Sequence, residues 1–176
     1  IVFAGTSEGH SQLWIRSLNS LTARVLPGTD GARYPFWSPD NRSVGFFADS
    51  KLKRIDISGG SAQVLANVPI NPAVGAAWNR EGIILFAGTL GPVFRVFAQG
   101  GEPTAVTRLD TQHLAHSFPQ FLPDGRHFLY FNYGGETQGA YIGQLDGSKT
   151  ERVLQADSPV VYAASGQLLF TRGGSL

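Results

Sequence analysis

Short runs of apolar residues, rich in β-branched and aromatic side chains, alternate along this chain with clusters of glycine, proline, asparagine, aspartate and serine. This alternation is typical of antiparallel strands joined by tight turns. No stretch shows the apolar spacing of an amphipathic helix. In its clearest part the pattern predicts four strands, which we label a to d: 32–38, 43–48, 52–57 and 62–65.

The four-strand pattern repeats along the chain. An aromatic residue in strand a recurs about every forty residues, at Trp37, Trp78, Phe121 and Tyr162. A period of this length, built from short strands, is the signature of β-propeller blades, and we place strand a nearest the axis. We therefore predict an all-β arc of four-stranded antiparallel blades, with the recurring tryptophans and Phe121 packed between neighbouring blades.

The phase of the repeat divides the chain into blades. Residues 1–4 correspond to strand b, so the chain enters its first blade part-way through. We expect about four blades' worth of sequence, with partial blades at 1–28 and 159–172 and complete blades at 32–68, 72–109 and 115–157. Since the chain also starts at Ile1 without a methionine, we expect a propeller segment of a longer protein that supplies the remaining blades.

Proline, aspartate and glycine mark the turns of the repeat. Pro39 and Asp40 lie between strands a and b, as do Pro123 and Asp124, and paired glycines at 59–60 separate c from d. Proline presets the turn, and aspartate accepts hydrogen bonds from the amides that follow it. We expect these aspartates to stabilise turns and favour this over a metal-binding or catalytic role. The glycines precede no helix, which argues against a phosphate-binding loop.

Composition narrows the possible functions. With 14 basic and 13 acidic residues the net charge is +1, so the chain lacks the positive excess of a nucleic-acid-binding domain. It has no cysteine, and its apolar runs are too short to insert into a membrane. Its one Gly-x-Ser-x-Gly match, at residues 5–9, lacks the alternation of strands and helices that presents the nucleophile of a hydrolase. We predict that this segment is not an enzyme and uses no cofactor or metal.

Three stretches, 37–42, 55–60 and 121–126, resemble the TolB-like, WD-repeat-like propellers of bacteria. Residues 36–47, followed by 52–56, look most like the C-terminal sensor propellers of bacterial serine/threonine protein kinases. That resemblance implies a non-catalytic sensor or interaction module of a signalling protein. It would bind a protein, peptide or small ligand on one face, in a periplasmic or extracytoplasmic location.

Two alternatives stay open. Related propellers gate access to prolyl oligopeptidase-like serine peptidases, whose catalytic domain would lie outside this chain, and the TolB resemblance allows an envelope scaffold. The sequence on either side of this segment would discriminate the sensor from the peptidase gate. A kinase domain and membrane helix upstream favour the sensor, whereas a hydrolase domain downstream favours the gate.

The candidate binding residues lie outside the repeating pattern, in the loops that enter each inner strand. Loops carried on a rigid scaffold are common sites of binding. We predict a partner-binding face at Tyr34, His113, His116 and Ser117, which lie at or before the start of strand a. The two histidines have a spacing that metal ligands can use, but no helix is predicted to put them on one face, so we favour a solvated loop.

Overall fold

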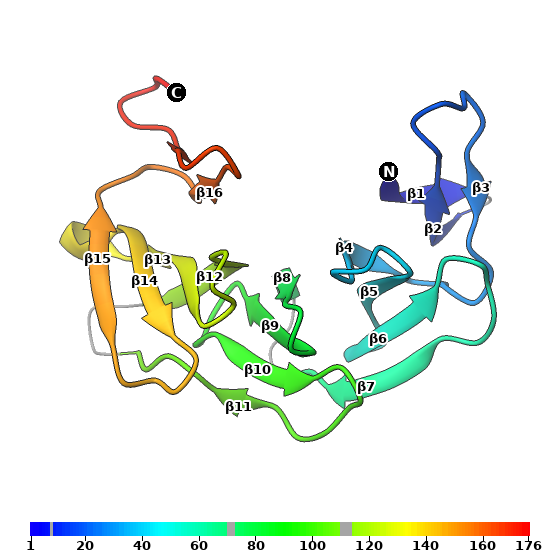
Figure 1. The fold of residues 1–176 in the computed structure, drawn as a ribbon, viewed down its shortest axis with the longest axis horizontal. Helices are drawn as coiled ribbons and strands as arrows, with labels where there is room; N and C mark the ends of the chain where they lie inside the picture. Colours follow the sequence, from blue (N-terminus) through cyan, green and yellow to red (C-terminus); the bar gives the residue numbers. More distant parts are fainter. Residues whose placement is uncertain (8, 70–72, 110–113) are drawn as a thin grey trace.

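The computed structural model describes residues 1–7, 9–69, 73–109 and 114–176. Their strands form separate antiparallel sheets that stand side by side in an open arc (Figure 1). The helical content of the described residues is a single 3-10 turn, η1 (Gly135–Thr137), and none of them forms a helix suited to crossing a membrane. The predicted all-β propeller arc is confirmed.

Three of the sheets are four-stranded and two are partial. The first, partial sheet contains β1 (Val2–Ser7), β2 (His10–Ile15) and β3 (Arg24–Val25). The second contains β4 (Arg33–Trp37), β5 (Ser43–Ala48), β6 (Lys51–Asp56) and β7 (Gln63–Asn67). The third contains β8 (Ala73–Trp78), β9 (Ile83–Gly88), β10 (Phe94–Phe97) and β11 (Thr104–Ala105). The fourth contains β12 (Ala115–Phe121), β13 (His127–Tyr133), β14 (Gly139–Gln144) and β15 (Thr150–Leu154), and the last pairs β16 (Val161–Tyr162) with β17 (Leu168–Leu169).

Each complete sheet runs from the inside of the arc to the outside. The inner strands β4, β8 and β12 lie on the concave side, and β7, β11 and β15 lie on the convex side (Figure 1). Because neighbouring strands are antiparallel, the connections fall on two faces. The entry face carries the loops into the inner strands and the hairpins between second and third strands. The turn face carries the turns that follow the inner strands, at 38–42, 79–82 and 122–126.

The core lies between the sheets rather than within any one of them. Each of four apolar clusters combines residues of two adjacent sheets. Phe46 and Phe47 are consecutive on β5 and point to opposite sides, Phe46 toward the first sheet and Phe47 toward the third. Trp37, Trp78 and Phe121 each pack on the cluster shared with the preceding sheet, which confirms their predicted role.

The predicted turn chemistry is also confirmed. The Asp40 carboxylate accepts a hydrogen bond from the Arg42 amide at 3.0 Å, and Asp124 makes the same bond in its own turn at 3.0 Å. Asn41 and Gly125 take positive φ angles of 58° and 68°. Both carboxylates therefore serve the local backbone, as their place between proline and glycine or asparagine indicates.

All three complete blades carry a bulge in the inner strand, where strand register shifts. At this position Tyr34 and Phe118 have φ angles of 49° and 53°, and each is followed by proline. Residues before proline favour extended backbone, and a sparsely populated backbone conformation costs about 1–3 kcal/mol. The third blade has Gly75 there, and a Cβ on it would lie 3.2 Å from the Phe118 Cα.

Candidate functional site

The entry face is hollowed beside the second sheet, in a cavity of about 380 Å³ that we call the entry cleft. Its walls come from the start of β4, the β5–β6 hairpin, and the ends of the chain segments that leave β7 and begin β8. The lining residues are Gly31, Arg33, Tyr34, 47–51, Val68 and Ala73.

A two-residue hairpin forms one wall of the entry cleft. Asp49 and Ser50 have φ angles of 54° and 55°, and the flanking residues Ala48 and Lys51 pair directly, as in the tight turns that match strand twist. The Ser50 carbonyl accepts the Val68 amide at 2.9 Å. The hairpin is therefore tied to the segment leaving β7, which fixes this wall.

The entry cleft carries surplus positive charge. Arg33 lies opposite Phe47 across the β4–β5 pair, so its side chain shares the side of the sheet that faces the third blade. Asp49 is occupied by Lys53, whose ammonium lies 2.6 Å from its carboxylate, and this hydrogen bond lowers the Asp49 pKa. The described residues provide no hydrogen bond or ion pair to the Arg33 side chain. An anionic group could therefore bind there.

Among the predicted binding residues that the structure describes, Tyr34 is the accessible one, with 45% of its surface exposed. It lines the entry cleft beside Arg33 and sits at the strained bulge of β4. Residues in sparsely populated backbone conformations cluster at active sites and ligand-binding positions. The bulge thus presents the ring on the entry face, where a partner-binding role was expected.

The other predicted binding residues are placed differently. His116 and Ser117 are buried on β12, with exposures of 1% and 0%. The His116 Nδ1 lies 2.9 Å from the Thr107 hydroxyl, and the Ser117 hydroxyl donates to the Gly88 carbonyl at 2.6 Å. These bonds join β12 to the third blade. His113 lies outside the described residues.

Sequence reasoning missed Arg33 and Lys51 as lining residues of the entry cleft. The sequence did contain a hint for each residue. Arg33 directly precedes Tyr34, and Lys51 follows the polar pair 49–50 between two apolar strands. What the sequence lacks is the spatial fact that the start of β4 and the β5–β6 hairpin meet at the same edge of the sheet.

A larger cavity of about 480 Å³, which we call the turn cleft, opens on the turn face between the second and third sheets. Arg54 pairs with Gly45, whose face is covered by the Phe36 ring, so Arg54 projects toward the third sheet. The Trp78 ring, from the third sheet, meets the Phe36 ring edge-on, with the two ring centroids 6.4 Å apart. The remaining lining residues are Ser38, Pro39, Asp40, Asn79, Arg80, Gly82, Ala98 and Gln99.

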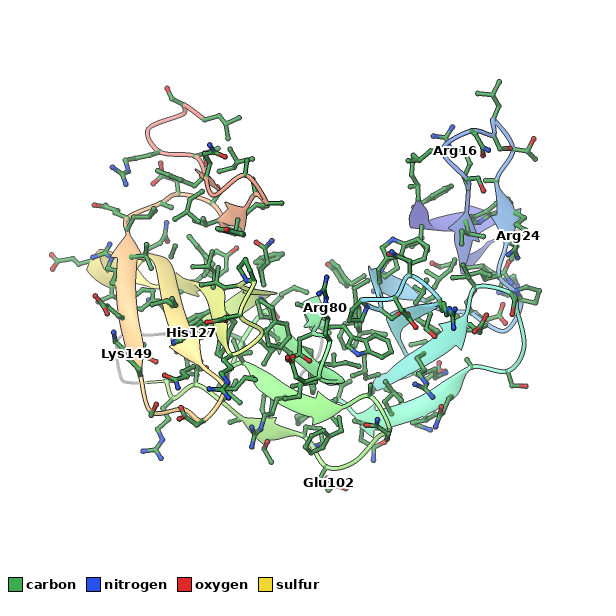
Figure 2. All side chains as sticks on the ribbon, viewed as in Figure 1. Arg16, Arg24, Arg80, Glu102, His127 and Lys149 are labelled. Atoms are coloured by element: carbon green, nitrogen blue, oxygen red, sulfur yellow. The ribbon has the colours of Figure 1, made fainter. Side chains whose placement is uncertain are left out.

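Arg80 lines the turn cleft at a position where the sequence departs from the repeat. The second and fourth blades have proline at this turn position, Pro39 and Pro123. Figure 2 places Arg80 on the concave side of the arc. Its side chain has no ion pair or hydrogen bond within the part of the chain that the structure describes.

The remaining polar clusters serve structure. His127 and Asp124 form an exposed pair 2.5 Å apart, in which the hydrogen bond from His127 lowers the Asp124 pKa. Asp124 also holds its turn, so the pair is an extension of that turn. In the described ranges, no three histidine, cysteine, aspartate or glutamate side chains come together as a metal site requires.

No known protein family matches this sequence, and no curated protein matches it. Solved structures share its fold. TolB from Acinetobacter baumannii is 16% identical, with a TM-score of 0.78, over 98% of this chain and 46% of that one. The nidogen/laminin complex gives 14% identity and a TM-score of 0.75, over 96% and 68% of the two chains. The tricorn protease gives 17% identity and a TM-score of 0.67, over 95% and 17%.

These similarities agree with the arc of blades described above. The chain spans less than half of the Acinetobacter TolB chain, so it corresponds to a part of such a propeller. At identities this low the likeness concerns the fold alone. The chain therefore has the architecture of a TolB-like β-propeller segment.

Proposed function

We propose that this chain is a non-catalytic binding segment of a propeller, which receives a protein or peptide partner on its entry face. The observation that carries this proposal is the entry cleft, where the strained, exposed Tyr34 stands beside Arg33, whose side chain has no partner among the residues that the structure describes. The bulge recurs at Phe118 in the fourth blade, but the combination of an arginine followed by a tyrosine occurs at the second blade, where Arg33 and Tyr34 both line the cleft. The nidogen/laminin complex, whose structure shares this fold, is a complex of two proteins.

A narrower form of the proposal makes the segment the sensor of a bacterial signalling protein such as a receptor serine/threonine kinase. This narrower proposal rests on the amino-acid sequence of residues 36–47 and 52–56, which resembles that of kinase sensor propellers. The similarity to solved structures does not test it. In this role, a partner bound at the entry cleft would favour one arrangement of the ring and so bias an attached output domain.

The second candidate is a gating propeller that controls access to a peptidase domain outside this chain. It is favoured by one observation, the likeness of this fold to a region of the tricorn protease. The two roles differ in what the entry face must do. A gating propeller lets a substrate pass on to the peptidase, whereas a sensor keeps its partner bound. A retained partner therefore favours the sensor.

The test is a selection of displayed short peptides on the purified protein. We expect enriched peptides to lose at least about tenfold in affinity for Tyr34→Ala and for Arg33→Gln, because each removes a main contact of the cleft. Lys149→Gln is the control, since it removes one positive charge from the fourth blade, directly before β15 and outside the entry cleft. Enriched peptides that bind both entry-face variants as tightly as the native protein would refute the placement.

A further inference from the structure

The turn cleft is a second binding site, which we infer takes a small organic acid, its carboxylate held by Arg54 and Arg80 and its ring body seated against Trp78. This site lies on the face opposite the entry cleft and does not depend on the function proposed above.

The first argument is the way the chain builds the third turn. Asn79 is buried, and its side chain accepts the Ile83 amide at 2.8 Å and donates to the Gly125 carbonyl of the fourth blade at 2.9 Å. These bonds hold the turn from both sides. Arg80 is consequently carried on a fixed backbone while its own side chain stays exposed.

The second argument concerns charge. Arg54 is oriented by one hydrogen bond, from its Nε to the Gln63 amide oxygen at 2.9 Å. The lining carboxylate, Asp40, is already engaged by the Ser38 hydroxyl at 2.6 Å and the Arg42 amide at 3.0 Å. Two guanidinium groups therefore share one cleft whose acidic residue is bound elsewhere, and guanidinium is the side chain best suited to carboxylate.

The third argument is shape. The Arg54 and Trp78 walls belong to different sheets and face each other, so a ligand would fit between blades. About 480 Å³ lies within the range of small-molecule sites and suits one sugar-sized or benzene-sized ring. Aromatic side chains bind ring faces well, and the amide of Gln99 adds a neutral hydrogen-bonding group at the rim.

The neighbouring cleft on the same face is a useful contrast. It lies between the third and fourth sheets and is lined by Arg95 and Arg126, but also by Glu81 and Asp146. Its charges balance within the wall. Arg95 also donates to the Leu145 carbonyl at 3.2 Å, across the two sheets. The same architecture thus gives a self-neutralised cleft in one place and a cationic one in the other.

The test uses two acids and their neutral counterparts, glucuronate with glucose and benzoate with benzyl alcohol, titrated into the purified protein by calorimetry and tryptophan fluorescence. We expect at least one acid to bind at least about tenfold more tightly than its neutral partner, the effect of one charge-assisted hydrogen bond. Binding of glucuronate alone would identify a sugar acid, and binding of benzoate alone a planar aromatic acid. The fluorescence response should vanish in Trp78→Phe.

Variants separate this site from the entry cleft. Arg80→Pro restores the residue of the other turns, so it removes the guanidinium while keeping the turn, and it should weaken acid binding about tenfold. The double variant Arg54→Gln with Arg80→Pro should abolish it, whereas Arg126→Gln and Arg33→Gln should leave it unchanged. Equal binding of acids and neutral counterparts, absence of binding, or unaltered binding by the double variant would overturn the inference and leave the entry-face proposal intact.

Discussion

The turns that follow β4 and β8 carry out the same reversal with different side chains. In the second blade, the Ser38 hydroxyl accepts the Ser43 amide at 2.9 Å and donates to Asp40 at 2.6 Å, so every partner is local. In the third blade, Asn79 occupies the serine position and bonds both to its own turn and to Gly125 in the next blade. Backbone geometry is kept because Asn41 and Gly82 both take positive φ.

This difference shows which part of the repeat is required. The positive φ position and one side-chain acceptor for the amide that closes the turn are retained, since an unpaired buried amide is costly. The proline and the aspartate are not retained. Their loss in the third blade coincides with a bond between blades and with the exposed Arg80, so local support has been replaced by support from a neighbour.

The largest effect is expected from Asn79→Ala. This change removes two partly buried hydrogen bonds and leaves the Ile83 amide and the Gly125 carbonyl without their partner, which should lower the free energy of unfolding by about 2–4 kcal/mol. Chemical denaturation measures it. Asn79→Ser is the matched control: it can restore the local bond, as Ser38 does, and should recover about half of the loss.

Ser38→Ala should lower the free energy of unfolding less, by about 1–2 kcal/mol. The Ser43 amide loses its side-chain acceptor, but no bond to another blade is broken. The same denaturation experiment applies. If Ser38→Ala proved more destabilising than Asn79→Ala, the local turn would matter more than the bond between blades, contrary to our comparison.

The positive φ position should respond less. Gly82→Ala places a Cβ at a φ of 76° and should cost about 1 kcal/mol, whereas Asn41→Gly relieves a φ of 58° and should change stability by only a few tenths. Thermal unfolding of both variants checks the two expectations. An equal and large loss in both would show that the side chain of Asn41 has a role that the turn does not explain.

The smallest effect concerns pH. The hydrogen bond from Ser38, followed by that from the Arg42 amide, lowers the Asp40 pKa below 3.8. Because the folded pKa lies below the unfolded one, Asp40 contributes stability above pH 3.8 that is lost as the pH falls through the folded value. Ser38→Ala should raise the Asp40 pKa, which NMR titration of its carboxyl carbon measures. The free energy of unfolding should then depend less on pH in this range.

Much of the fold could be predicted from the sequence because each blade repeats the same local instructions. The aromatic residue of strand a, the turn that follows it and the apolar pairs of β5 and β9 depend on neighbours a few residues away. The bulges could not be predicted in this way. Tyr34 and Phe118 precede proline, which favours extended backbone, yet both have positive φ at bulges of inner strands that contact β8.

The candidate sites were less predictable than the fold. The position of Tyr34 at the entry to an inner strand predicts an accessible side chain, but His116 and Ser117 are at the entry to an inner strand too and are buried. Accessibility depends on which side of β12 meets the third blade, and one sequence does not contain that information. Arg54 and Trp78 face each other from different sheets, and the Asn79 bond to Gly125 spans a similar gap. Such pairs depend on blade assembly.

The sharing of every core cluster between two blades sets how the arc should come apart. A chain whose units bury their apolar residues only against their neighbours behaves like a one-dimensional array, in which each unit's opening free energy depends on the two beside it. Amide hydrogen exchange should therefore be slowest in β5, β9 and β13, which have a neighbouring sheet on each side. When residues 1–176 are studied alone, exchange should become faster stepwise toward β1 and β17, whose sheets each have one neighbouring sheet in the segment.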